Sequence, residues 1–76
     1  MDGLGRMIHH EACERAMAEL QKLPEGKRRI VLLRVIQGMN LREIHEVTGL
    51  TISNVAYLLD QGLREIAKRL KEAGVL

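Results

Sequence analysis

Apolar side chains recur every three or four residues along most of this chain, which is the spacing of one face of an α-helix. The first run predicts an amphipathic helix over residues 7–22, with a stripe formed by Ile8, Ala12, Ala16, Leu20 and Leu23. Residues 1–6 carry two glycines and no such period. We therefore expect residues 1–6 to be a disordered start that carries no fold information.

A second helix is predicted to begin near Pro24, because proline cannot continue a helix but suits the first turn of the next one. Glu25 follows it, and a carboxylate is favoured near the positive end of the helix dipole. The run from residue 30 to residue 36 is apolar almost all round, and Gly38 ends it. This pattern predicts a buried helix at the hub of the core.

A third, short helix is predicted over residues 41–47. Asn40 is a favoured capping residue, and Glu43 stands three positions later, which is the arrangement of a capping box. Gly49 suits the left-handed conformation that closes a helix, and Thr51 can cap the next one. The interval between the two helices is therefore short.

The fourth helix is predicted from Thr51 to about Ala73, with Gly74 as its stop. Its apolar positions repeat by three and four at Ile52, Val55, Leu59, Leu63, Ile66 and Leu70. Ile44 and Leu50 would pack against this helix at Val55 and Leu59.

Two helices joined by a short turn that contains glycine form a helix-turn-helix, whose second helix enters the DNA major groove. The spacing around Gly49 predicts this unit over about residues 41–73. Ser53, Asn54 and Tyr57 would face outward from the second helix. The predicted fold class is therefore all-α, a single domain over residues 7–76 with three to four helices, and winged elements are absent because no segment has a strand pattern.

Composition narrows the setting of this domain. The chain has 76 residues, a single aromatic side chain (Tyr57) and a single cysteine (Cys13), so its core must be aliphatic and it has no internal disulfide framework. No segment reads as a signal peptide or as a run of about 18 apolar residues, so we expect a cytoplasmic protein without a membrane partner. The net charge is +2, and the basic surplus lies after Pro24, which is compatible with a nucleic-acid partner without requiring one.

Residues 23–70 resemble region four of bacterial RNA polymerase sigma factors, particularly the extracytoplasmic-function type. The resemblance lies in the stretches LPEGKRRIVLLRVIQGMNLREIHEVTGL and TISNVAYLLDQGLREIAKRL. Its most specific element is the ordered series of a Leu-Pro-Glu start, a Leu-Leu-Arg helix, a glycine before the capped short helix, and Gly-Leu-Thr before Asn-Val.

The resemblance implies a domain that recognises the minus-35 promoter element in transcription initiation and contacts core RNA polymerase. Carried over by position, the residues facing base edges or nearby phosphates would be Thr51, Ser53, Asn54, Tyr57 and Gln61. Asparagine and glutamine can pair with adenine, and serine or threonine can bond to several bases. Phosphate contacts that orient the domain would come from Arg28, Arg42 and Arg64.

The chain departs from the family at several of these positions. Many members carry lysine or arginine on the exposed face of the recognition helix, where this chain has Ala56, Leu58 and Gln61, and Asp60 adds a negative charge. We therefore expect the isolated domain to bind DNA weakly, although tethering to polymerase can raise the effective concentration to about millimolar. His45 replaces a frequent alanine of the family, so its ring would either push the two helices apart or turn outward.

Two alternatives to DNA readout remain open at this point. Tyr57 and Leu58 would form an exposed apolar patch that binds an anti-sigma factor or another transcription regulator, or Leu58 would complete the core between Val55 and Gly62. An autonomous dimeric repressor would need an apolar surface on the first helix.

Chemistry of other kinds has little support in the sequence. His9, His10 and Cys13 have the spacing of ligands on one helical face, but zinc needs a fourth ligand and none is evident, so we expect no metal. The same residues could suggest a cysteine nucleophile with a histidine base, but no third residue would orient the base and the chain is too short to form a pocket. We therefore expect no enzyme activity and no cofactor.

Overall fold

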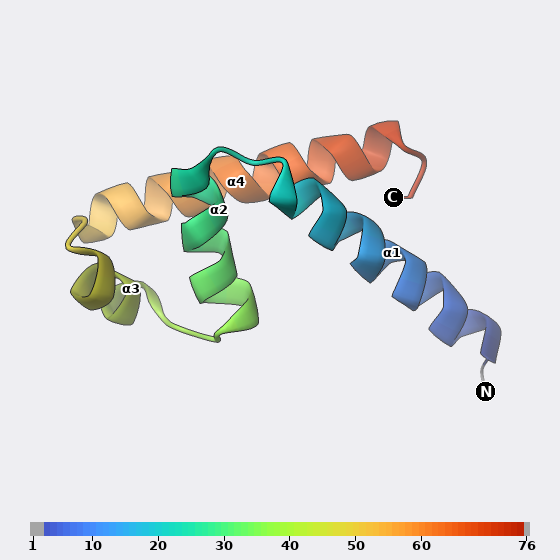
Figure 1. Cartoon of the computed structure of the whole chain (residues 1–76), viewed down its shortest axis with the longest axis horizontal. Helices are drawn as coiled ribbons and strands as arrows, with labels where there is room; N and C mark the ends of the chain where they lie inside the picture. The colour runs from blue at the N-terminus through green and yellow to red at the C-terminus, as the bar shows by residue number, and fades with distance from the viewer. Residues whose placement is uncertain (1–2, 76) are drawn as a thin grey trace.

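The computed structural model describes residues 3–75, with side chains from residue 11 onward. These residues form four α-helices, α1 (Gly3–Gln21), α2 (Glu25–Val31), α3 (Leu41–Thr48) and α4 (Ile52–Glu72), and one π-helical segment, η1 (Leu32–Ile36). No strand occurs within this described part, so the all-α fold class is confirmed. The ribbon measures 42 × 25 × 16 Å, with α4 along its length, α2 crossing α4 near its middle and α3 beside its start (Figure 1).

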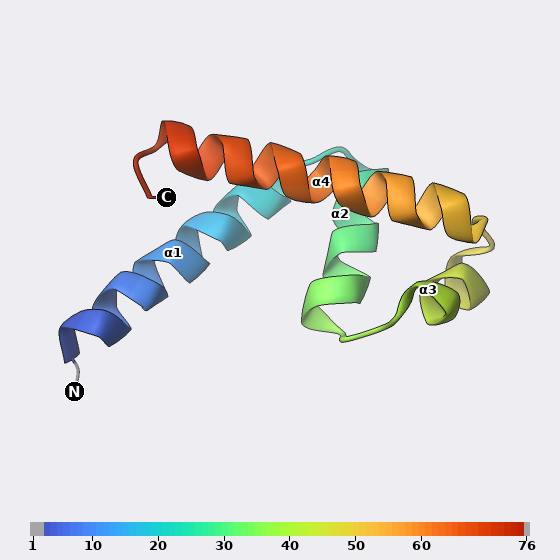
Figure 2. The same cartoon turned by 180° about the vertical axis from the view of Figure 1, so that it is seen from behind.

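Among the described side chains of α1, those that join the core come from its last turns. Leu20 is buried together with Leu23, which follows the helix, and Ala16 packs against this cluster. The first half of α1 diverges from α4 in both views (Figures 1 and 2). The helix begins at Gly3, four residues before its predicted start at Met7, so residues 3–6 are helical where we expected an irregular segment. Extension of an existing helix adds one backbone hydrogen bond per residue without a new nucleation step. Residues 1–2 and the Ile8 side chain lie outside the described part.

Helix α2 begins as predicted, because Pro24 precedes its first residue, Glu25. Its last two residues join two parts of the core. Ile30 packs with Ile44 and Val55. Val31 packs with Leu20 of α1, Leu23 of the connection between α1 and α2, and Ile66 and Leu70 of α4. Leu59 of α4 lies against both clusters. The hub predicted for this helix therefore exists, but it consists of residues 30–31.

Leu32 and Leu33 are half-buried and pack against the two clusters, but the end of the apolar run is not buried as predicted. After Val31 the chain widens into η1, where Gln37 N–H donates to the Leu32 carbonyl at 3.1 Å. Such a five-residue bonding pattern inserts one extra residue in a turn and rotates the next side chains about the helix axis. Val35 and Ile36 are consequently 58% and 53% exposed.

Helices α3 and α4 have the caps that the sequence predicts. Asn40 Oδ1 accepts from Glu43 N–H at 2.8 Å, and Glu43 Oε1 accepts from Asn40 N–H at 2.9 Å, which completes the capping box. Along α4, Val55, Ile66 and Leu70 are buried as expected, whereas Ile52 and Leu63 are exposed. The predicted buried face therefore included two residues that are exposed, because α2 and α3 cover only part of the α4 circumference.

Charged side chains form ion pairs where the helices meet. Glu19 of α1 is only 7% exposed, and its carboxylate lies 3.4 Å from Lys22 Nζ and 3.7 Å from Arg69 Nε of α4. Arg69 also lies 3.9 Å from Glu65, which is 4.0 Å from Lys27 of α2. These ion pairs connect α1 and α2 to the second half of α4.

Candidate nucleic-acid interface

The connection between α3 and α4 is a three-residue turn, residues 49–51. Gly49 has a φ of 78° and its N–H donates to the His45 carbonyl at 2.9 Å, which ends α3 in the left-handed conformation that glycine adopts without strain. Thr51 then starts α4, since its Oγ1 accepts from Asn54 N–H at 3.1 Å. The predicted turn at Gly49 and cap at Thr51 are both present.

The angle between the two helices rests on a fully buried apolar contact. Ile44 of α3 and Val55 of α4 are both 0% exposed and pack with Ile30 of α2. Leu50 and Leu59 lie against this cluster, as predicted. Burial of these apolar side chains stabilises the packing of α3 against α4.

Four of the five predicted base-facing residues lie on the exposed surface of the first turns of α4. Tyr57 is 60% exposed, and the others in this set are also exposed: Thr51, Ser53 and Asn54. Gln61 stands one turn further along and is half-buried. The Thr51 oxygen already serves the helix cap, so its hydroxyl hydrogen is what remains for a ligand.

Ile52 is a candidate contact residue that the sequence pattern assigned to the core. It is 44% exposed in the first turn of α4, beside Ser53. Ile52 is the first residue of α4, so no preceding turn of the helix covers its side chain. Its position directly after the capping residue could have indicated this exposure from the sequence. An apolar side chain there suits the methyl group of thymine.

The structure separates the three arginines predicted to touch phosphates. Arg42 is exposed in the first turn of α3. Arg64 Nε donates to both carboxylate oxygens of Asp60, at 2.9 and 3.1 Å, so its charge is partly neutralised. Arg28 Nη1 donates to the Gln21 carbonyl at 3.3 Å and is thereby held against the end of α1.

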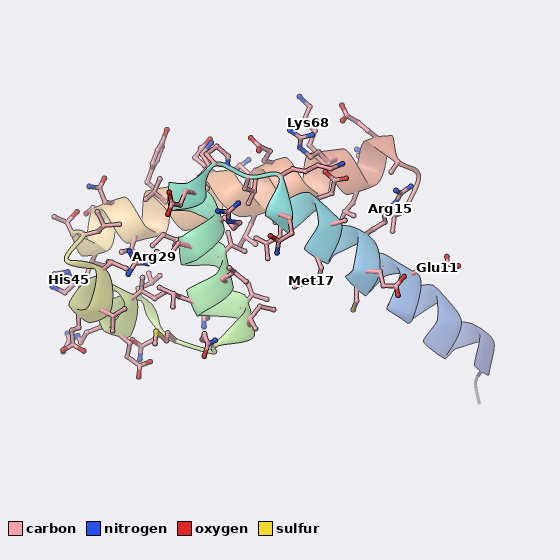
Figure 3. All side chains as sticks on the ribbon, viewed as in Figure 1. Glu11, Arg15, Met17, Arg29, His45 and Lys68 are labelled. Atoms are coloured by element: carbon pink, nitrogen blue, oxygen red, sulfur yellow. The ribbon has the colours of Figure 1, made fainter. Side chains whose placement is uncertain are left out.

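Arg29 is a basic residue near the turn that was not among those three. It is exposed, and in Figure 3 its side chain extends from α2 toward the side on which α3 lies. No ion pair within the described residues engages Arg29 or Arg42. Their charges are available to an anionic ligand.

Leu58 belongs to the core side of α4. It is half-buried and packs against the cluster of Ile30, Ile44 and Val55, so the alternative in which it completes the core is confirmed and only Tyr57 of the proposed apolar pair is exposed. Ala56 is half-buried as well. Neither Ala56 nor Leu58 is therefore fully exposed, although both were expected on the exposed face of the helix.

His45 neither pushes α3 and α4 apart nor turns fully outward. Its ring is half-buried and bonds through Nδ1 to the Leu50 carbonyl across the turn. Both expectations for this residue are thus replaced by a specific contact.

Other candidate sites have less structural support. Cys13 is exposed on α1, and the side chains of His9 and His10 lie outside the described part. Among the side chains that are described, no three His, Cys, Asp or Glu residues gather in the manner of a metal site. No helix within residues 3–75 has the length and apolar character needed to cross a bilayer.

The family comparison agrees with this geometry. The model of the family described as sigma-70, region 4, matches residues 13–66. The chain belongs to this family. No curated protein and no solved structure matches the chain.

Sigma-70 region 4 domains in general bind promoter DNA at the minus-35 element and contact core RNA polymerase. The match runs from the middle of α1 to Ile66 of α4, so it includes α3, the turn and the first part of α4. At the level of the family, the match associates this domain with transcription initiation.

Proposed function

We propose that this sigma-70 region 4 domain is a non-catalytic module that reads minus-35 promoter DNA through the first turns of α4. The observation that carries the proposal is the rigid corner at Gly49, where Ser53, Asn54 and Tyr57 stand exposed above the buried contact of Ile44 with Val55. A recognition helix needs this combination of a fixed angle and free polar side chains in its first turns.

The proposed contacts divide into two kinds. Asn54 and Ser53 would bond to base edges, and Ile52 would contact a thymine methyl group. Arg29 and Arg42 would contact phosphates and orient the helix in the groove without reading sequence. Arg64 contributes less to phosphate binding, because Asp60 holds it at 2.9 Å.

Binding by the isolated domain is expected to be weak and salt-dependent. With two phosphate contacts, the slope of the logarithm of the binding constant against the logarithm of salt concentration should be about −2. In a transcription complex, attachment to core RNA polymerase would compensate by raising the effective concentration to about millimolar. The proposal therefore includes polymerase as a partner and a cytoplasmic setting.

A titration followed by NMR tests the proposal even when binding is weak. A duplex with a minus-35-like sequence and a scrambled duplex of equal length are added at about 50 and 200 mM salt. The expected result is larger amide shifts at residues 52–54 with the first duplex and weaker binding at the higher salt concentration. Equal responses to both sequences and both salt concentrations would refute DNA reading.

A second candidate function is a sigma-like interaction domain that binds an anti-sigma factor or another regulator with little DNA readout. It is favoured by the exposed apolar side chains of Val35 and Ile36 at the end of η1, away from the first turn of α4. Substitution of Ile36 by lysine separates the two functions. Because this side chain is exposed, the fold should persist, DNA binding should be retained, and only binding of a protein regulator should fall.

A further inference from the structure

Leu50 is held to α3 through both of its backbone polar groups. Its N–H donates to Thr48 Oγ1 at 3.2 Å, and its carbonyl accepts from the Nδ1 of His45. Thr48 is itself fixed, because its hydroxyl donates to the Ile44 carbonyl at 2.7 Å. A turn residue usually leaves such groups to water, so this double engagement by side chains is a specific feature of the corner.

The side chain of Leu50 adds a third point of attachment. It packs against the buried cluster that contains Ile44 and Val55. Leu50 immediately precedes Thr51, the residue that caps α4. The path of the chain into the first turn of α4 is consequently determined by where α3 holds Leu50.

We infer that His45 and Thr48 are positioning residues that clamp Leu50 and thereby set the placement of the first turn of α4. Neither residue touches a ligand in this role. The clamp is a property of the free domain, and only its effect on DNA reading rests on the function proposed above.

The clamp has a spectroscopic signature in the unmodified protein. The Leu50 carbonyl can only accept a hydrogen bond, so Nδ1 of His45 must carry the hydrogen. In the neutral ring, Nε2 is then the unprotonated nitrogen. We expect nitrogen-15 spectra of the neutral imidazole to show the Nδ1–H tautomer for His45. The Nε2–H tautomer would overturn the clamp without any substitution.

Matched substitutions test each half of the clamp. Thr48→Val removes the hydroxyl at nearly constant shape, and Thr48→Ser keeps it. Hydrogen exchange at Leu50 N–H should become about two- to tenfold faster in Thr48→Val, which corresponds to the loss of one hydrogen bond, and should stay near the original rate in Thr48→Ser. Unchanged exchange in Thr48→Val would overturn this half of the proposal.

The His45 half is tested with a pair of similar shape. His45→Asn retains an N–H donor near the position of Nδ1, whereas His45→Leu has none. The distinction between minus-35-like and scrambled duplexes should fall by about tenfold in His45→Leu and recover in His45→Asn, while the salt slope stays constant. Val47→Ala, an exposed change on the same helix, serves as the control and should alter neither property.

The two proposals fail in different ways. If the unmodified domain shows no DNA preference, the proposed function fails, but the tautomer and the Leu50 exchange still report on the clamp. If His45→Leu retains full discrimination while the domain does read DNA, the clamp does not position the recognition helix.

Discussion

Gly62 of α4 and Val31 of α2 approach so closely that a Cβ atom added at position 62 would lie 2.7 Å from Val31 Cγ2. Leu23 Cδ1 lies 3.7 Å from the same point. The crossing of α2 over α4 therefore depends on the absence of a side chain at residue 62, where an ordinary helix position would favour alanine.

Gly62→Ala should destabilise the domain by about 1–2 kcal/mol, because overpacking outweighs the gain of about 1 kcal/mol in helix propensity. Urea unfolding would measure the change. Gly26→Ala is the matched control, since nothing lies within 4 Å of its added Cβ, and it should be neutral or stabilise by up to about 1 kcal/mol. Val31→Ala combined with Gly62→Ala should lose less stability than the sum of the single changes, and strict additivity would contradict the contact.

Asn40→Ala should lower the free energy of unfolding by about 1 kcal/mol, because it leaves Glu43 N–H without its acceptor at the start of α3. Asn40→Ser should retain most of the stability, since serine forms the same capping box. Thermal unfolding of both variants provides the measurement. Equal melting temperatures for the alanine and serine variants would show that the capping box does not stabilise α3.

Leu58→Arg should destabilise the domain by about 2–3 kcal/mol, because the guanidinium would replace a side chain packed against Ile44 and Val55. Tyr57→Arg changes its exposed neighbour and should alter stability by no more than about 0.5 kcal/mol. Circular dichroism during denaturant unfolding distinguishes the two. If the Leu58→Arg domain were as stable as the original, the packing of Leu58 against the core would be contradicted.

Asp60→Asn should strengthen DNA binding and steepen its salt dependence. The change removes a negative charge from the outer side of α4 and frees Arg64, whose Nε now bonds to both Asp60 oxygens. One additional phosphate contact would change the salt slope by about 0.9. Glu72→Gln, an exposed acid at the other end of α4, is the control for a simple change in net charge. An equal effect of both substitutions would exclude a local role for Arg64.

Local signals in the sequence were sufficient for the features that depend on a few consecutive residues. The capping box at Asn40 and Glu43, the left-handed Gly49 and the cap at Thr51 each follow from the chemistry of residues within about one turn. For the same reason the helix-turn-helix and the exposed positions of Ser53 and Asn54 were predictable.

Features that depend on contacts between residues far apart in the sequence could not be predicted from local patterns. The exposure of Val35 and Ile36 follows from the π-helical turn, and the exposure of Ile52 and Leu63 follows from how little of α4 its neighbours cover. The requirement for glycine at residue 62 has no local sign, because only the crossing of α2 creates it. The ion pair of Arg64 with Asp60, by contrast, could have been predicted, since the two residues are four positions apart on one helix.

Leu59 packs against both apolar clusters. Two adjacent residues of α2 also join them, because Ile30 belongs to one cluster and Val31 to the other. Because the two clusters are connected, we expect the helix-turn-helix and the packed C-terminal end of α1 to unfold together. The domain should melt in one calorimetric step, with van't Hoff and calorimetric enthalpies in agreement. Heat or denaturant that loosens α1 from Leu70 and Ile66 would therefore also disrupt the helix-turn-helix.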